Sequence, residues 1–161
     1  MVDLVDPALP VWDLCCDHGK IGYGVLTRHS ATPVVFVDRA VATVDRLERA
    51  LERNPSSAGR CQTLCADVLQ MELPRTPANF VVAGVSSNVI VSFLGRLADR
   101  RGDRIICNTF QDATRFETRV LALGLRIDGS VDVETPSGRL QRVWQISVPS
   151  GASGADGPDS L

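Results

Sequence analysis

Two stretches decide the fold: Val11-Trp-Asp-Leu-Cys-Cys-Asp-His-Gly-Lys-Ile-Gly22 and Val34-Val-Phe-Val-Asp38. The first is a hydrophobic strand that breaks into a tight turn of small residues, and the second is a hydrophobic strand that ends on a carboxylate. An acidic residue about 20 positions after a glycine-bearing first turn is the arrangement with which doubly wound α/β folds hold a ribose. The sequence therefore predicts a cofactor that contains adenosine.

Length and composition are those of an ordinary globular chain. The 161 residues fit one domain with a sizeable core, and 44% are hydrophobic while 22% are charged. No apolar run approaches the roughly 20 residues of a membrane span, and the first residues do not resemble a signal peptide. We therefore expect a cytoplasmic protein with no membrane partner. The formal net charge of −2 excludes a strongly basic nucleic-acid-binding domain but allows a local basic patch.

The five cysteines, an odd number, do not suggest a disulfide framework. Cys61 and Cys65 have a spacing that suits half of a zinc site, with Cys15 and Cys16 as the other half. Each cysteine sits in or beside an apolar run, however, where a reduced thiol behaves as a small core residue. We therefore predict that the protein holds no metal.

Strand and helix patterns alternate along the chain, which then closes with an antiparallel hairpin. This order predicts a Rossmann-like α/β fold, with a seven-stranded, mostly parallel sheet, one antiparallel edge strand and helices on both faces. We assign residues 1–148 to this domain and predict that 149–161 form a disordered tail, because they lack bulky apolar residues. The predicted strands cover 11–14, 34–37, 61–65, 80–83, 104–107, 125–134 and 141–148, and the predicted helices cover 21–29, 41–53, 89–100 and 112–123.

The loops that follow the strands hold the candidate site residues, because ligands of open α/β sheets bind outside the carboxyl ends of the strands. The first loop does not match G-x-G-x-x-G, since cysteines stand where a dinucleotide fold needs glycine to bring its backbone close to a pyrophosphate. A cofactor without phosphate tolerates small residues there, and a cationic one favours carboxylates. S-adenosylmethionine, which leaves S-adenosylhomocysteine as product, fits both requirements.

Each acidic residue after a strand receives a role in this scheme. Asp13 or Asp17 receives the ammonium, directly or through water, and Asp38 accepts both ribose hydroxyls. Asp67 accepts a hydrogen bond from the adenine amino group, and Ala66 contributes a backbone donor. For Asp17, capping of the following helix is an equally good interpretation. The other residues that we expect at the cofactor lie in the same loops: Cys15, His18, Gly19, Arg39 and Gly84.

The chain resembles the bacterial tRNA adenine-N1-methyltransferases that modify adenine-22 in the D-arm, which are class I S-adenosylmethionine-dependent enzymes. Their first motif, Asp-Ile-Gly-Ser-Asp-His, is matched by Asp13-Leu-Cys-Cys-Asp17-His18, and their acid after the second strand by Asp38. Their Ile-Ala-Gly-Met-Gly-Gly segment is similar to Val82-Ala83-Gly84-Val85-Ser86-Ser87, and the polar residue after their fifth strand corresponds to Asn108. The resemblance covers about residues 11–148.

Two departures from that family concern the substrate. The Gly-Met-Gly-Gly loop, which looks onto the substrate base in the family, reads Gly84-Val85-Ser86-Ser87 here, and Thr109 replaces the proline after the fifth strand. The family also carries a C-terminal helical domain that helps to grip RNA, which we expect this chain to lack. The resemblance therefore implies the fold and the cofactor more directly than it implies a tRNA substrate.

If adenine is the methyl acceptor, the lone pair of its N1 attacks the methyl group directly, so the protein mainly orients the two reactants. We expect Ser86, Asn88 and Asn108 to line the base site, because these polar residues follow the fourth and fifth strands. We expect Asp17 and His18 to lie where the base site meets the cofactor. These five residues are the candidate catalytic residues.

Other interpretations stay open at this point. Ser87 or Asn88 suits the N-cap of the helix predicted near Val89, and His18 suits a turn histidine that packs over the cofactor. A methyltransferase for a small molecule or protein is favoured by the acidic composition. A non-catalytic module that binds the cofactor or a partner protein is favoured by the altered loop at 84–87.

Overall fold

The computed structural model describes residues 1–135 and 138–149, and the whole of the predicted sheet falls within them. The predicted disordered tail lies outside the described residues from position 150 onward. The elements are η1 (Val2–Leu4), β1 (Val11–Leu14), α1 (Lys20–Arg28), β2 (Val34–Asp38), α2 (Val41–Glu52), η2 (Pro55–Ser57), β3 (Cys61–Cys65), β4 (Asn79–Val82), α3 (Ser87–Gly95), β5 (Arg104–Asn108), α4 (Ala113–Ala122), β6 (Arg126–Glu134) and β7 (Leu140–Ser147).

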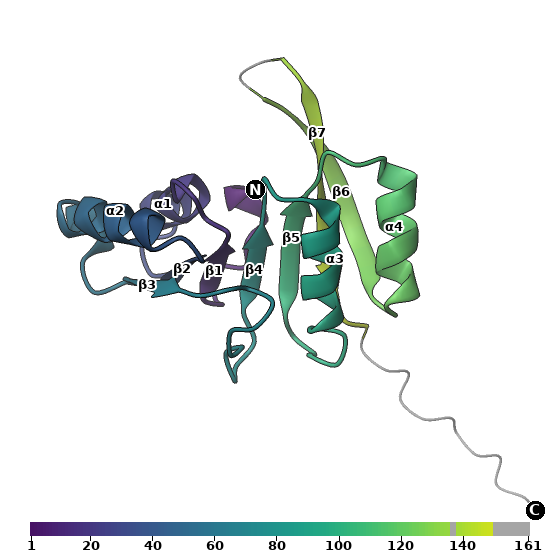
Figure 1. The fold of residues 1–161 in the computed structure, drawn as a ribbon, viewed down its shortest axis with the longest axis horizontal. Helices are drawn as coiled ribbons and strands as arrows, with labels where there is room; N and C mark the ends of the chain where they lie inside the picture. The colour runs from purple at the N-terminus through teal and green to yellow at the C-terminus, as the bar shows by residue number, and fades with distance from the viewer. Residues whose placement is uncertain (136–137, 150–161) are drawn as a thin grey trace, which may run out of the picture.

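The strands form one seven-stranded sheet in the order β3-β2-β1-β4-β5-β7-β6 (Figure 1). β1 to β5 run parallel to one another, whereas β7 runs antiparallel to both β5 and β6. The predicted Rossmann-like fold is therefore confirmed. The reversed strand is the last but one rather than the outermost, because β7 returns along β5 and leaves β6 at the edge.

Alternate residues of the central strands face two separate cores. Phe80 and Val82 of β4 pack in the core that includes α3 and α4, whereas Val81 packs in the core that includes α1 and α2. Every residue of β4 is buried, as is typical of a parallel strand covered by helices on both faces. Among the described helices, none has the length and apolar content needed to cross a membrane.

α1 approaches β1 and β2 closely at Gly22. A Cβ atom at this position would lie 2.2 Å from the Phe36 ring and 3.0 Å from the Asp13 carboxylate, so only glycine fits without a shift of its neighbours. The Gly22 amide donates a hydrogen bond to Asp13 Oδ2 at 2.8 Å. This contact fixes the start of α1, and with it the preceding turn, against the ends of the two strands.

Toward the opposite end of the strand order, Trp144 of β7 holds the hairpin against α4. Its ring packs on Phe116 with the ring centroids 4.6 Å apart, and its indole N–H donates to Glu117 at 2.9 Å. Beyond this contact, β6 and β7 continue past the carboxyl end of β5 as a projecting ribbon (Figure 1). The hairpin therefore rises beside the loop that follows β5.

Candidate active site

A cavity of about 440 Å³ opens where the carboxyl ends of β1 to β4 meet. Its volume falls within the range of small-molecule sites, roughly 300–1,000 Å³. The predicted cofactor residues line it, apart from Asp13, His18 and Gly19. The complete wall consists of Cys15, Asp17, Asp38, Arg39, Ala66, Asp67, Val68, Leu69, Gly84, Val85 and Val89.

The turn after β1 places two non-glycine residues in the left-handed backbone region, Cys15 with φ 53° and Asp17 with φ 46°. This conformation costs a residue with a side chain roughly 1–2 kcal/mol. Backbone contacts to β2 hold the turn in place: the Asp17 amide donates to Asp38 Oδ2 at 3.1 Å, and the Cys16 amide donates to the Val37 carbonyl at 3.1 Å. The strained turn is therefore docked on the end of β2.

Asp38 ends β2 with its carboxylate at the cavity wall. Oδ2 accepts the hydrogen bond from Asp17, and Oδ1 accepts one from the Ala40 amide at 2.9 Å. Each carboxylate oxygen has about two acceptor positions, so each keeps capacity for a further donor from a ligand. The two oxygens suit the two ribose hydroxyls that the sequence assigns to Asp38.

Asp67 lines the cavity just beyond β3, and its Oδ1 accepts a hydrogen bond from the Leu69 amide at 2.9 Å. The carboxylate keeps acceptor capacity that suits an adenine amino group. The role predicted for Ala66 needs correction, because its amide donates to the Asp38 carbonyl at 2.9 Å. This bond continues the pairing of β2 with β3 and occupies the proposed adenine donor.

The apolar part of the wall was not predicted from the sequence; it consists of Val68, Leu69, Val85 and Val89. Ligand pockets are lined mainly by apolar side chains, with a few polar groups that fix orientation, and an adenine ring needs such a surface. The signal was present in the sequence, because apolar residues follow Asp67 and Gly84 directly.

His18 and Asp17 form a close pair beside the cavity. His18 Nδ1 lies 2.6 Å from Asp17 Oδ2, with 60% and 67% of the two side chains exposed. Arg46 of α2 lies 3.4 Å from the other oxygen of the carboxylate. Asp17 does not cap α1, since the N-cap residue of that helix is Gly19, which makes no side-chain cap bond. His18 adjoins the cavity through Asp17 rather than lining it.

Asp13 is buried beneath α1 and does not line the cavity. Only 3% of the residue is exposed, and its carboxylate accepts the Gly22 amide. Burial raises the pKa of Asp13 from 3.8 to about 7, although the hydrogen bond from Gly22 acts in the opposite direction. Of the two acids predicted to receive the cofactor ammonium, directly or through water, only Asp17 lines the cavity, whereas the Asp13 carboxyl group holds the start of α1.

Gly19 and Cys15 belong to the same turn but have different roles. Gly19 has φ 66°, and a Cβ atom there would lie 2.8 Å from the Leu47 side chain, so its role is in packing rather than in cofactor binding. Cys15 lines the cavity, where burial and then the charges of Asp38 and Asp67 raise the pKa of its thiol to about 11. A thiol that stays protonated is a neutral wall residue, not a nucleophile.

The remaining cysteines only partly match the prediction of core residues. Cys107 is buried and Cys61 is partly buried, but Cys65 is exposed on the edge strand β3, where its thiol donates to the Arg39 carbonyl at 3.7 Å. In residues 1–135 and 138–149, no group of three or more His, Cys, Asp or Glu side chains is placed to hold a metal ion.

Ser86 and Asn88, predicted for the base site, both lie at the start of α3. The cap of this helix is Ser86, not Ser87 or Asn88, and its Oγ accepts from the Val89 amide at 3.4 Å. Asn88 is exposed, and its Oδ1 accepts a hydrogen bond from Arg119 of α4 at 2.9 Å. Both polar groups therefore have intramolecular partners.

Asn108, the third residue predicted for the base site, is buried at the end of β5. Its Oδ1 accepts from the Gly84 amide at 3.2 Å, and its Nδ2 donates to Gln141 of β7 at 2.9 Å. The side chain therefore links the loop after β4 to the hairpin. It shapes the wall between these segments rather than presenting free groups to a base.

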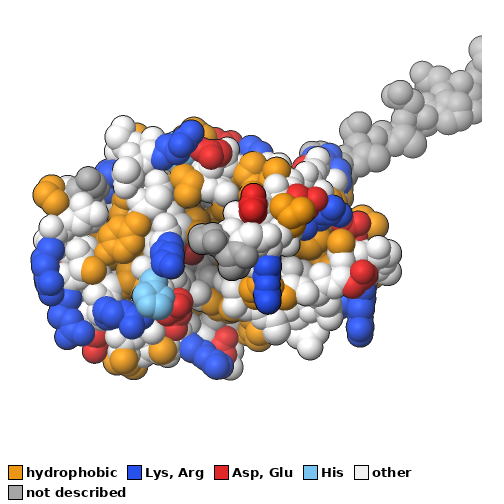
Figure 2. All heavy atoms as spheres, turned by 90° about the horizontal axis from the view of Figure 1, so that it is seen from above, with side chains coloured by type: hydrophobic (Ala, Val, Ile, Leu, Met, Phe, Trp, Pro, Cys, Tyr) orange, Lys and Arg blue, Asp and Glu red, His pale blue; other side chains and the backbone are white. Residues whose placement is uncertain are grey.

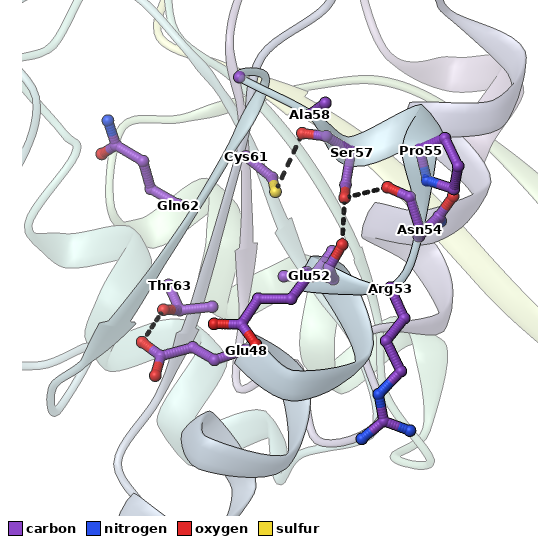
Figure 3. Close-up of a pocket in the computed structure, with 12 residues that line it drawn as sticks. Glu48, Glu52, Arg53, Asn54, Pro55, Ser57, Ala58, Cys61, Gln62 and Thr63 are labelled. Atoms are coloured by element: carbon purple, nitrogen blue, oxygen red, sulfur yellow. Dashed lines mark hydrogen bonds between the residues drawn. The ribbon is translucent and has the colours of Figure 1, made fainter.

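A larger cavity, about 620 Å³, lies at the edge of the sheet between the end of α2, η2 and β3 (Figure 3). Several of its polar side chains are bonded within the protein: the Thr63 hydroxyl donates to Glu48 at 2.5 Å, and the Ser57 hydroxyl lies 2.5 Å from the Leu51 carbonyl oxygen. None of the predicted site residues lines it. We place the active site in the smaller cavity because the carboxylates and the strand ends converge there.

Fold and site together define a Rossmann-like methyltransferase. Residues 1–134 match the methyltransferase domain family, and the chain belongs to that family. It is an S-adenosylmethionine-dependent methyltransferase, with S-adenosylmethionine as its cofactor. The cavity fits this cofactor, since Asp17, Asp38 and Asp67 offer carboxylates to a cation with a ribose diol, and apolar residues complete the wall.

Solved structures with a similar fold act on different substrates. Sp1610 of Streptococcus pneumoniae, assigned as a tRNA (m1A22) methyltransferase, is 14% identical with a TM-score of 0.78, and the alignment covers 96% of this chain and 70% of that one. TrmK, the m1A22 tRNA methyltransferase of B. subtilis, is 14% identical with a TM-score of 0.77 and coverages of 92% and 63%. Magnesium protoporphyrin IX methyltransferase of Synechocystis, with bound SAM, is 14% identical with a TM-score of 0.69 and coverages of 88% and 70%. No curated protein matches the sequence.

Proposed function

We propose that this methyltransferase modifies adenine at N1 in RNA, with tRNA as its substrate and the cytoplasm as its location. The resemblance of the first motif to the adenine-22 enzymes supports the proposal, as do the tRNA methyltransferases among the proteins of similar fold. The chain spans 70% and 63% of those two structures.

The observation that carries the proposal is a set of arginines around the site, on a protein whose formal net charge is −2. Basic side chains are spread over the face that bears the carboxyl ends of the strands (Figure 2). Guanidinium groups suit phosphate because they donate two parallel hydrogen bonds. Five arginines line the cofactor cavity, contact a site residue, or line a further cavity between the loop after β5 and the β6–β7 hairpin: Arg39, Arg46, Arg119, Arg139 and Arg142.

The chemistry asks mainly for orientation. S-adenosylmethionine supplies an electrophilic methyl group, which the N1 lone pair of an unpaired adenine accepts as the C–S bond breaks and the electron pair stays on sulfur. Asp38 and Asp67 hold the cofactor by its hydroxyls and amino group. Asp17 places a negative charge beside the cavity, where it stabilises the positive charge that passes to the purine ring.

Mass spectrometry tests the proposal directly. The protein is incubated with total tRNA and cofactor carrying a labelled methyl group, and the RNA is then digested to nucleosides. We expect the label in 1-methyladenosine, with Asp38→Ala protein as the control for contaminating activity. Turnover should also fall steeply as salt rises, because phosphate contacts release counterions.

A small-molecule substrate is the second candidate function. The net charge of −2 favours it, and so does the similar fold of NcsB1, an O-methyltransferase solved with 1,4-dihydroxy-2-naphthoic acid. A label found only in added metabolites, with turnover insensitive to salt, would establish this function instead. Tight cofactor binding with no transfer to either pool would identify a non-catalytic module.

A further inference from the structure

A second cavity, about 370 Å³, lies between the loop after β5 and the β6–β7 hairpin. The side chain of Asn108 bridges two residues that border this cavity and the cofactor cavity, respectively. Asn108 accepts from the Gly84 amide, which borders the cofactor cavity, and donates to Gln141, which borders the second cavity. The two cavities are therefore neighbours at the carboxyl edge of the sheet, and the second cavity offers three groups to a ligand.

The first group is the ring of Phe110, which lines the second cavity and is 72% exposed. A single exposed apolar side chain is ordinary on a protein surface, but this ring borders a cavity and so lies where a ligand can reach it. Base stacking on an aromatic side chain is worth about 1–3 kcal/mol and requires only an accessible face. Phe110 therefore offers a stacking surface for a planar ring.

The second group is the side-chain carbonyl of Gln111, which also lines the cavity. Within the described parts of the chain, its Oε1 is one of two buried side-chain polar atoms without a hydrogen-bond partner, the other being the Tyr23 hydroxyl. A buried acceptor without a donor costs about 1–3 kcal/mol. Because Oε1 is buried, the Gln111 side chain must turn toward the cavity before a ligand N–H reaches it, and the new hydrogen bond then recovers this free energy.

The third group is the guanidinium of Arg139, at the hairpin end of the cavity. Its neighbour Arg142 is held by both oxygens of Asp132, at 2.8 Å and 3.0 Å. Arg139 has no such ion pair among the described residues. It is exposed and therefore remains able to bind an anionic group such as phosphate.

We infer that the second cavity is the acceptor site and that it takes an adenine nucleotide. The base stacks on Phe110, its exocyclic amino group donates to Gln111 Oε1, and its phosphate binds Arg139. This inference rests on the proposed function and adds to it the residues that recognise the acceptor. It also gives Asn108 a task, since that residue forms the wall across which the two ligands meet.

The test uses adenosine 5′-monophosphate as the probe, added to full-length protein saturated with S-adenosylhomocysteine so that the cofactor cavity is filled. Amide NMR shifts should change at Phe110, Gln111 and the hairpin, and they give the Kd. Phe110→Ala should weaken binding about 5- to 100-fold, whereas Phe110→Trp should retain it. Leu121→Ala, which removes an exposed apolar side chain from α4, away from the cavity, is the matched control and should bind as the unmodified protein does. The same spectra report whether each variant is folded.

A second pair of variants tests recognition of the amino group. Gln111→Leu should weaken binding of adenosine 5′-monophosphate about 10-fold and leave the N6,N6-dimethyl analogue, which has no N–H there, unchanged. Gln111→Glu keeps an acceptor oxygen at the same place and should still discriminate between the two nucleotides. Equal effects of Gln111→Leu on both nucleotides would overturn the assignment.

A third arm separates a free nucleotide from a nucleotide within RNA. If the acceptor belongs to RNA, Phe110→Ala should raise the KM for tRNA while the Kd for S-adenosylhomocysteine stays unchanged. Methylation of tRNA with wild-type KM in Phe110→Ala would refute this acceptor site and leave the proposed function intact. Binding of the probe at this cavity without any tRNA methylation would do the reverse, and would point to a free adenine nucleotide as the acceptor.

Discussion

The two ends of the carboxyl edge of the sheet use their polar residues differently. At the ends of β1 to β4, the carboxylates of Asp38 and Asp67 each accept hydrogen bonds from backbone amides. They also line a cavity and can accept further hydrogen bonds there. At the ends of β4 and β5, the side chains of Ser86, Asn88 and Asn108 are bonded to other parts of the protein. The first region is suited to hold a charged ligand. In the second region, the predicted polar residues connect parts of the protein to one another and thereby shape the wall of the site.

Loss of the Asp38 carboxylate should produce the largest effect and tests the cofactor side of this comparison. Asp38→Ala removes the proposed acceptor for two ribose hydroxyls, so we expect the affinity for S-adenosylhomocysteine to fall by about 1–3 kcal/mol. Calorimetry measures the Kd. Asp45→Ala, which removes an exposed carboxylate on α2, is the control and should leave the Kd unchanged. Equal affinities in the two variants would show that the ribose binds elsewhere.

The carboxyl group of Asp13 is buried under α1 and serves the fold instead of a ligand. Its burial should make the stability of the protein depend on pH. Its pKa is about 7 in the folded protein against 3.8 when unfolded, so the native state binds the proton more tightly. The contribution to stability is complete below pH 3.8 and is lost as the pH rises through 7. Between pH 5.5 and 7 the loss amounts to about 2 kcal/mol, and it levels off above that range.

Urea unfolding at pH 5.5 and at pH 8 checks the titration of Asp13. Asp13→Asn keeps an oxygen for the Gly22 amide but has no charge to bury, so the pH dependence of its unfolding free energy should be flatter by about 2 kcal/mol. The variant should also bind S-adenosylhomocysteine with unchanged affinity. A loss of binding in the folded variant would return Asp13 to the cofactor.

The sequence predicted the elements well because each has a local cause. The all-apolar β4 and the alternation of strands with helices required a parallel sheet with helices on both faces. The local sequence patterns do not determine the position of β7 between β5 and β6. It depends on which strand of the hairpin pairs with β5; in the structure this is β7, whose Trp144 also packs on Phe116 of α4.

Candidate cofactor residues could be predicted where a suitable residue type, here an acid, stands directly at the end of a strand. Asp38 and Asp67 stand where a ribose and an adenine are expected, and both line the cavity. Asp13 was predicted as a possible ligand of the cofactor ammonium, because its place in the motif does not reveal that Gly22 covers its carboxylate. Gln111 was not predicted as a site residue, since its unpartnered oxygen follows from the packing of the hairpin and not from the local sequence.

Cys15 offers a smaller test of how the first turn is built. Its φ of 53° favours glycine, the residue that the similar family motif has at this place. We expect Cys15→Gly to be more stable than Cys15→Ala by about 1 kcal/mol, because only the alanine variant keeps a Cβ in the left-handed region. Cys16 is the matched control, since its φ is not positive, and there the order of the two variants should reverse. Thermal unfolding of the four proteins measures the difference.

Asn88 should give the smallest effect on the fold and the clearest information about the acceptor side. Its side chain is exposed and contacts Arg119, so Asn88→Ala should change the unfolding free energy by less than about 0.5 kcal/mol and leave the Kd for S-adenosylhomocysteine unchanged. We expect turnover on tRNA to fall about 3- to 10-fold, the worth of one hydrogen bond. Asn88→Asp keeps the acceptor for Arg119 but loses the amide donor. If turnover falls in both variants, the amide contacts the acceptor, whereas a loss in Asn88→Ala alone means that Asn88 acts by positioning Arg119. Full turnover in both would remove Asn88 from the site and leave base recognition to the second cavity.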